Sequence, residues 1–240
     1  MSSLTPSQQE LANLLLNTKI EAKVIRRKQK LDGSYYLEES SRPTSPIDFS
    51  QDPGEFALKV HEVKIDAPLS PIYVNLRNLP GNVLSKIARV LAEVKLESPQ
   101  DFCTGVPKAA LVIAQKFSEV SGMSFMNVFE KIGLNTDRKI VIKEGVNPKP
   151  DTKLLVIDDV VAHGKSKLEA LEAAKQVGFY VNMLVLIDRE QGGIEQVEKE
   201  GCRVYAAMKL TDILEYYKEK NMITQDQYQK SIDYLSKSKI

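Results

Sequence analysis

The sequence has little of what several protein classes require. Its 240 residues contain no Trp, two Cys and two His. Cys103 and Cys202 lie far apart, without the spacing of a metal site, so we expect reduced core thiols in a cytosolic protein. With only His61 and His163, a His-rich metal site is excluded. A Ser-His-Asp triad would have to use one of these two residues.

Excess charge of one sign and long apolar runs are also missing. Thirty-three Lys and Arg nearly balance 32 Asp and Glu, so the net charge of +1 predicts neither a nucleic acid nor a membrane partner. No apolar run approaches the ~20 residues of a transmembrane helix, and the N-terminus does not resemble a secretory signal. The 42% of apolar residues are ordinary for a globular chain long enough to form one sizeable core.

Strand-like and helix-like segments alternate from about residue 70 to 215. This alternation predicts an α/β fold, with a central, mainly parallel sheet flanked by helices. The expected strands are 70–77, 101–107, 123–129, 153–159, 180–190 and 203–208, and the expected helices are 82–96, 108–122, 165–178 and 193–201. Ligands of such sheets bind beyond the carboxyl ends of the strands. The candidate pocket is therefore formed by loops 104–109, 158–166 and 187–193.

The two ends of the chain differ from this pattern. We expect residues 1–53 to form an N-terminal helix (5–18) and a small hood-like region, with a hairpin around Asp32-Gly33 and an irregular connection at 42–54. Residues 55–60 read as a strand. The basic cluster of residues 26–30 either contacts a polyanion or forms a solvated strand face, and the second interpretation is favoured. Residues 54–215 form the predicted core, and residues 216–240 a helical tail.

The segment "LLVIDDVVAHGKSKLEA" (154–170) carries the chemistry. Its "GKS" suggests a nucleotide-binding P-loop, but that motif needs Gly at the position of Asp159, so this interpretation fails. A turn at 162–166 leading into a helix predicts a site for one phosphate, because free amides and the helix dipole favour an anion there. Asp158 and Asp159 would repel a phosphate but accept hydrogen bonds from ribose hydroxyls and reach Mg²⁺. Adjacent Asp residues also occur in solvated turns; the neighbouring helix start favours a ribose-5-phosphate pocket.

The same segment resembles the phosphoribosyl-diphosphate motif of type I phosphoribosyltransferases. Four further stretches are similar to the orotate phosphoribosyltransferases of that family: "FALK" (56–59), "SPIYVNLR" (70–77), "GVPKAALVIA" (105–114) and "LIDREQGG" (186–193). The resemblance covers roughly residues 54–215. It implies the type I phosphoribosyltransferase fold, a homodimer, and transfer of a phosphoribosyl group from phosphoribosyl diphosphate to orotate with Mg²⁺.

The resemblance also implies roles for individual residues. Asp158 and Asp159 would hold the ribose and, through its hydroxyls or water, the Mg²⁺. The 5-phosphate would bind to the turn formed by Ala162, His163, Gly164, Lys165 and Ser166. The residues expected to meet orotate are Lys59 and Arg189, and Lys108 and Lys131 are the candidates for the leaving diphosphate, with Lys131 in a catalytic role.

The chain departs from the family pattern at several of these places. Ala162 and His163 replace the usual hydroxyl residues, "VHEVKIDAPL" is inserted after Lys59, Lys108 lies one position early, and the basic loop is represented by "FEKIGLNTDRKIVIKEG". Two alternatives therefore stay open: a non-catalytic relative that binds a nucleotide or phosphoribosyl ligand, and a transferase for another base.

Overall fold

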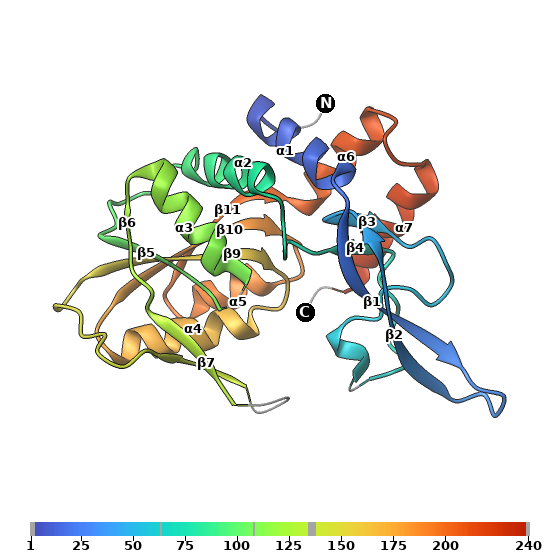
Figure 1. Ribbon diagram of the computed structural model, residues 1–240, viewed down its shortest axis with the longest axis horizontal. Helices are drawn as coiled ribbons and strands as arrows, with labels where there is room; N and C mark the ends of the chain where they lie inside the picture. The colour runs from blue at the N-terminus through green and yellow to red at the C-terminus, as the bar shows by residue number, and fades with distance from the viewer. Residues whose placement is uncertain (1–2, 63, 108, 134–137, 239–240) are drawn as a thin grey trace.

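A five-stranded parallel sheet forms the centre of the protein (Figure 1). The computed structural model describes residues 3–62, 64–107, 109–133 and 138–238, with the side chains of residues 59, 60 and 165 outside the description. The strand order is β11-β10-β9-β5-β6, and each neighbouring pair is parallel. The bounds are β5 (Phe102–Gly105), β6 (Ser124–Phe125), β9 (Lys153–Val161), β10 (Tyr180–Asp188) and β11 (Arg203–Lys209). The predicted fold class is confirmed.

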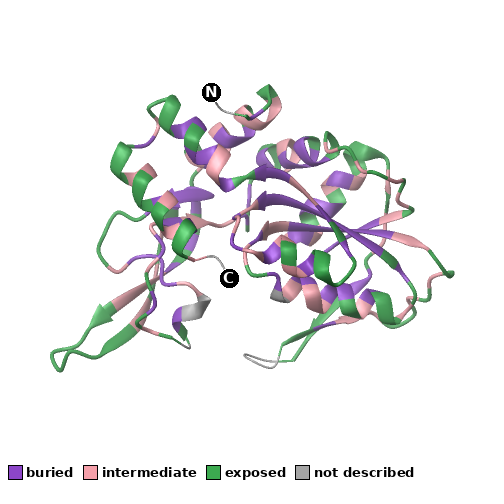
Figure 2. Cartoon of the chain, turned by 180° about the vertical axis from the view of Figure 1, so that it is seen from behind, coloured by how far each residue is buried: buried purple, intermediate pink, exposed green. Residues whose placement is uncertain are grey.

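Helices cover both faces of this sheet. One core cluster joins alternate sheet residues such as Leu155 and Ile157 to α2 (Gly81–Ala92), α3 (Ala109–Ser121) and α6 (Leu210–Glu219). A second cluster joins Leu154 and Val156 to α4 (Lys165–Gln176) and α5 (Gly193–Lys199). Figure 2 shows the buried residues concentrated in the central strands. Strands buried on both faces have continuous apolar sequences, which explains the composition of residues 154–157.

The predicted N-terminal helix and hairpin are both present. Helix α1 (Pro6–Asn17) begins with a capping box between Thr5 and Gln8. Strands β1 (Ile20–Gln29) and β2 (Tyr35–Thr44) then form an antiparallel arm that projects from the body of the molecule (Figure 1). The connection predicted as irregular is partly wrong, because β2 continues to Thr44 and β3 (Ile47–Phe49) pairs with β4 (Ile72–Val74).

The strand predicted at residues 55–60 is absent. Two backbone hydrogen bonds, from Ala57 N to Ile25 O (2.9 Å) and from Arg27 N to Gly54 O (2.8 Å), align the segment with β1. The chain then turns into a 3₁₀ helix, η1 (Lys59–Glu62). The buried His61 ring stabilises this turn, because its Nε2 lies 3.1 Å from Ala67 O. The tight turn that follows Leu58 replaces the extended backbone that a strand needs.

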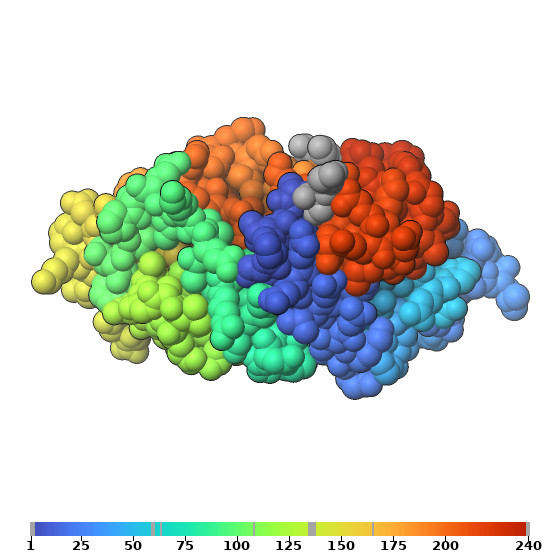
Figure 3. Space-filling model, turned by 90° about the horizontal axis from the view of Figure 1, so that it is seen from above, coloured from blue at the N-terminus to red at the C-terminus, as the bar shows by residue number. Residues whose placement is uncertain are grey.

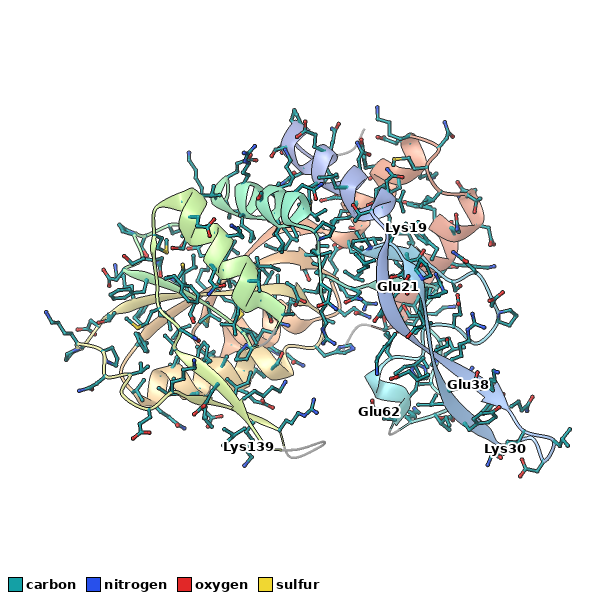
Figure 4. All side chains as sticks on the ribbon, in the orientation of Figure 1. Lys19, Glu21, Lys30, Glu38, Glu62 and Lys139 are labelled. Atoms are coloured by element: carbon teal, nitrogen blue, oxygen red, sulfur yellow. The ribbon has the colours of Figure 1, made fainter. Side chains whose placement is uncertain are left out.

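The arginines of the arm's basic cluster are engaged within the protein. Arg26 Nη2 contacts Asp52 Oδ2 at 2.9 Å and the buried Glu55 Oε1 at 2.8 Å. Arg27 Nη1 donates to the carbonyl oxygens of residues 65 and 67, and the Lys28 ammonium pairs with Glu38. Figure 4 shows Lys30 near the tip of the arm, beyond Glu38. The two arginines of the cluster are therefore engaged within the protein, whereas Lys28 and Lys30 lie on an exposed part of the arm.

One further sequence prediction changes in the structure, and the helical character predicted for the C-terminal residues is present. The strand expected at 123–129 divides into β6 and β7 (Phe129–Ile132), and β7 pairs with β8 (Lys139–Ile142) as an antiparallel hairpin along α4. At the C-terminus, α6 and α7 (Gln225–Lys237) pack beside α1, where Tyr217 Oη donates to Ala12 O at 2.6 Å. Figure 3 shows this contact between the two ends of the chain. In the described residues, no helix is long and apolar enough to cross a membrane.

Candidate active site

The three predicted loops lie at one edge of the sheet. Strands β5, β9 and β10 are parallel neighbours, so their carboxyl ends point the same way. β5 ends at Gly105, opposite Ile157, and β9 continues four residues further. Asp159 lies beyond the end of β5, and its backbone N–H donates to the side-chain oxygen Oδ1 of Asp158 at 2.9 Å. The acidic pair is therefore placed where β9 loses one of its neighbours.

The two carboxylates of the pair have different environments. Asp158 is 4% exposed, and its Oδ2 lies 2.7 Å from the Lys167 ammonium. Asp159 is half-buried, and its Oδ1 accepts from the Val160 amide at 2.8 Å. Burial and the nearby charge of Asp158 raise the pKa of Asp159 to about 7. The pair thus combines one ion-paired carboxylate with one that titrates near neutral pH.

Lys167 is a site residue that sequence reasoning missed. It is 8% exposed, and its ammonium also donates to Val160 O at 2.6 Å. Burial opposes its charge, but the charge and hydrogen bond of Asp158 prevail and raise the pKa of Lys167. A signal was present in the sequence: Lys167 stands at helical spacing with the buried residues Ala170, Leu171 and Ala174. A lysine on the apolar face of a helix requires a buried partner.

The turn predicted to bind a phosphate leads into the first turn of α4. Gly164 is the N-cap of this helix, with a left-handed φ of 69°, and no described side chain caps it. The turn also packs against the loop after β10, because a Cβ at Gly193 would lie 2.4 Å from Ala162 O. Only glycine allows that close approach. Ala162 and Ser166 are half-buried and His163 is exposed, so the turn lies at the surface of the site edge.

Arg189, which follows β10, is a buried cation with donors unused. It is 8% exposed, and its Nε and Nη2 have no hydrogen-bond partner among the described residues. Burial lowers the pKa of Arg189. The next residues are anchored, because Glu190 Oε2 accepts from Thr211 Oγ1 at 2.5 Å and Gln191 Nε2 donates to Ser238 of the C-terminal segment. Two donors of Arg189 are therefore available for a hydrogen-bond acceptor.

His163 and Arg189 belong to the same site. Burial and, next, the positive charge of Arg189 lower the pKa of His163, and a hydrogen bond with the Gln191 backbone opposes this shift. At neutral pH the imidazole is therefore mainly uncharged. His163 therefore does not supply a positive charge to the turn that was predicted to bind a phosphate.

The remaining predicted residues are placed as follows. Lys131 is exposed on β7, opposite Ile140 of the hairpin, and Figure 4 shows Lys139 on the same hairpin. Lys59 begins η1, and Lys165 begins α4, but their side chains are outside the description. Lys108 lies outside the described residues. The structure thus brings together the acidic pair, the phosphate turn and Arg189, and the roles of the four lysines stay predictions.

The acidic pair fits the chemistry of Mg²⁺. This ion prefers oxygen ligands and is usually held by one or two carboxylates together with substrate phosphates. In the described part of the chain, no group of three or more His, Cys, Asp or Glu side chains could hold a metal ion. The prediction that Asp158 and Asp159 lie near the ion, through the ribose hydroxyls or water, therefore stays a prediction.

Comparison with known proteins identifies the family. No protein-family model matches the chain. The orotate phosphoribosyltransferase of Aquifex aeolicus is 33% identical over 157 residues, which cover 61% of this chain and 82% of that protein. The corresponding enzyme of Pyrobaculum aerophilum is 31% identical over 189 residues, covering 75% and 93%. The chain belongs to the orotate phosphoribosyltransferase family.

Comparison with solved structures shows similarity over a larger part of this chain. Leishmania donovani UMP synthase matches with a TM-score of 0.68 and 24% identity, over 96% of this chain. This chain spans only 42% of the length of that protein. The match confirms the fold across nearly the whole chain.

Proposed function

We propose that the protein is an orotate phosphoribosyltransferase. It would transfer the phosphoribosyl group of phosphoribosyl diphosphate to orotate, giving orotidine 5′-monophosphate and diphosphate, a step in the synthesis of pyrimidine nucleotides. The bond between C1 of the ribose and the diphosphate oxygen breaks, and the electron pair leaves with the diphosphate. A ring nitrogen of orotate forms the new bond to C1 and gives its proton to solvent.

The orphaned guanidinium of Arg189 carries this proposal. A buried donor without a partner costs free energy that a bound acceptor would recover. Orotate carries a carboxylate, and a carboxylate accepts two parallel hydrogen bonds from an arginine. The Nε and Nη2 atoms that lack partners in the described residues form one edge of that fork. Family membership supports the same substrate.

The other parts of the site support the sugar phosphate. The amides of the 162–166 turn are proposed to bind the 5-phosphate, and the acidic pair to bind the ribose hydroxyls. Mg²⁺, held through those hydroxyls or water near Asp158 and Asp159, would supply positive charge to the diphosphate. Positioning the two substrates and excluding water would supply much of the catalysis. Lys131, Lys59 and Lys108 remain proposed contacts for the diphosphate and orotate.

Assembly and location belong to the same proposal. We expect a homodimer, as the resemblance implies, in which the basic hairpin of one protomer reaches the neighbouring site. We expect the protein in the cytoplasm, where its two free, buried cysteines would stay reduced.

The decisive experiment mixes the protein with phosphoribosyl diphosphate, Mg²⁺ and orotate and follows the absorbance of orotate. We expect turnover in the wild type and in Asp151→Asn, an exposed control before β9, and its loss in Asp159→Asn. Thermal stabilisation by phosphoribosyl diphosphate without turnover would refute the enzyme and favour a ligand-binding relative. Turnover with another base alone would refute orotate as the substrate.

A further inference from the structure

Lys167 occupies a position where a lysine is unfavourable without a specific partner. It is the third residue of α4, inside the first turn, where the helix dipole disfavours a positive charge. It is also buried beside the apolar cluster that contains Ala170 and Leu171. The sequence nevertheless places a cation at this point. The contacts of its ammonium therefore indicate its role.

Those contacts form a clamp on the end of β9. The ammonium lies 2.7 Å from Asp158 Oδ2 and 2.6 Å from Val160 O, so it spans both sides of Asp159 along the chain. The other oxygen of Asp158 accepts from the Asp159 amide at 2.9 Å. Both carboxylate oxygens of Asp158 are therefore occupied by the protein itself.

Asp159 is the carboxylate that this arrangement leaves for a ligand. It is more exposed than Asp158 and has no ion-pair partner among the described residues. Asp159 nevertheless lies close to Asp158, because the charge of Asp158 contributes to the raised pKa of Asp159. The two aspartates therefore share one site, in which Asp158 is the one that carries an ion pair among the described residues.

We propose that Lys167 is a positioning residue that neutralises and fixes Asp158, so that Asp159 alone receives the ribose hydroxyls. This inference rests on the proposed function and refines it. The ion pair removes one of two negative charges beside the turn that binds the 5-phosphate, and repulsion of an anionic substrate falls accordingly. The clamp on Val160 O also fixes the backbone on which Asp159 is carried.

The test compares Lys167→Met and Lys167→Arg with Lys175→Met, an exposed lysine on the same helix. In Lys167→Met, Asp158 is an unpaired charge, so we expect the KM for phosphoribosyl diphosphate to rise about tenfold or more. The KM for orotate should stay within about twofold. Lys167→Arg should retain most of the affinity, and Lys175→Met should resemble the wild type. Equal KM values in Lys167→Met and Lys175→Met would overturn the inference.

A double-mutant cycle separates positioning from a merely structural effect. Asp158→Asn combined with Lys167→Met removes both charges, and we expect it to bind phosphoribosyl diphosphate better than Lys167→Met alone. Asp158→Asn by itself should reduce activity less than Asp159→Asn does. An Asp158→Asn variant as inactive as Asp159→Asn would overturn the inference even if Lys167→Met failed to fold. A wild type that neither binds nor converts phosphoribosyl diphosphate would overturn the proposed function itself.

Discussion

Replacing Arg189 by methionine should stabilise the protein and impair it as an enzyme. In the free protein, Nε and Nη2 of Arg189 are buried without partners in the described chain. Each unsatisfied donor costs about 1–3 kcal/mol, and methionine of similar length removes both. We expect the free energy of unfolding to rise by a net ~1 kcal/mol, because the change of side-chain shape also removes some packing. For a chain of this size, that gain raises Tm by about 2–4 °C.

The same substitution removes the proposed partner of the orotate carboxylate. Two charge-assisted hydrogen bonds are worth about 3 kcal/mol together at the lower limit. The kcat/KM for orotate should therefore fall roughly 150-fold. Saturating orotate should raise the Tm of the wild type but not that of Arg189→Met. The KM for phosphoribosyl diphosphate should change little.

Thermal melts and steady-state kinetics on Arg189→Met and a matched control decide the matter. Arg203→Met removes an exposed arginine that is paired with Glu97 at 2.8 Å, and a surface pair is worth about 0–1 kcal/mol. The control should keep both activity and Tm. A lower Tm with unchanged kcat/KM in Arg189→Met would show that the guanidinium is structural, and the reasoning would be refuted.

Three further predictions follow from other parts of the structure. Gly193→Ala places a Cβ 2.4 Å from the Ala162 carbonyl oxygen, so the turn at 162–166 must shift. Kinetics should show a raised KM for phosphoribosyl diphosphate in this variant, whereas Gly81→Ala, where an added Cβ meets no atom within 4 Å, should leave that KM unchanged. Burial opposes ionisation of Glu55, but hydrogen bonds from the Gln51 amide and from Arg42 and Arg26 lower its pKa below 4.5. The ionised Glu55 therefore stabilises the protein above pH ~4.5, and this stabilisation is lost as the pH falls further. The difference in Tm between the wild type and Glu55→Gln should accordingly shrink in acid. Burial raises the pKa of Cys103 to about 11 and of Cys202 to about 12, so a thiol reagent at pH 8 should label neither in the native protein and both in denaturant; rapid native labelling would contradict this burial.

Several sequence predictions failed where a contact distant in the chain decided the conformation. The segment 55–60 has the composition of a strand, yet it ends in a 3₁₀ helix because His61 and Arg27 bind the carbonyls of the inserted loop. The basic residues of the arm were predicted to form a solvated strand face, which holds for the exposed Lys28 and Lys30, but Arg26 is paired with the buried Glu55 from another segment. The partners of Arg26 and Arg27 lie 29 to 40 residues away in the chain, beyond the reach of local patterns.

The sequence by itself determined the alternation of strands and helices, the parallel sheet and the placement of the acidic pair and the phosphate turn at one edge. These features depend on local periodicity and on the rule that parallel strands share one carboxyl edge. Only the tertiary structure decided that the Lys167 ammonium meets Asp158 and that Nε and Nη2 of Arg189 have no hydrogen-bond partner among the described residues. The physical reason is that an ion pair depends on side-chain distances of a few ångströms, and those distances are set by the packing of α4 and the loop after β10 against β9.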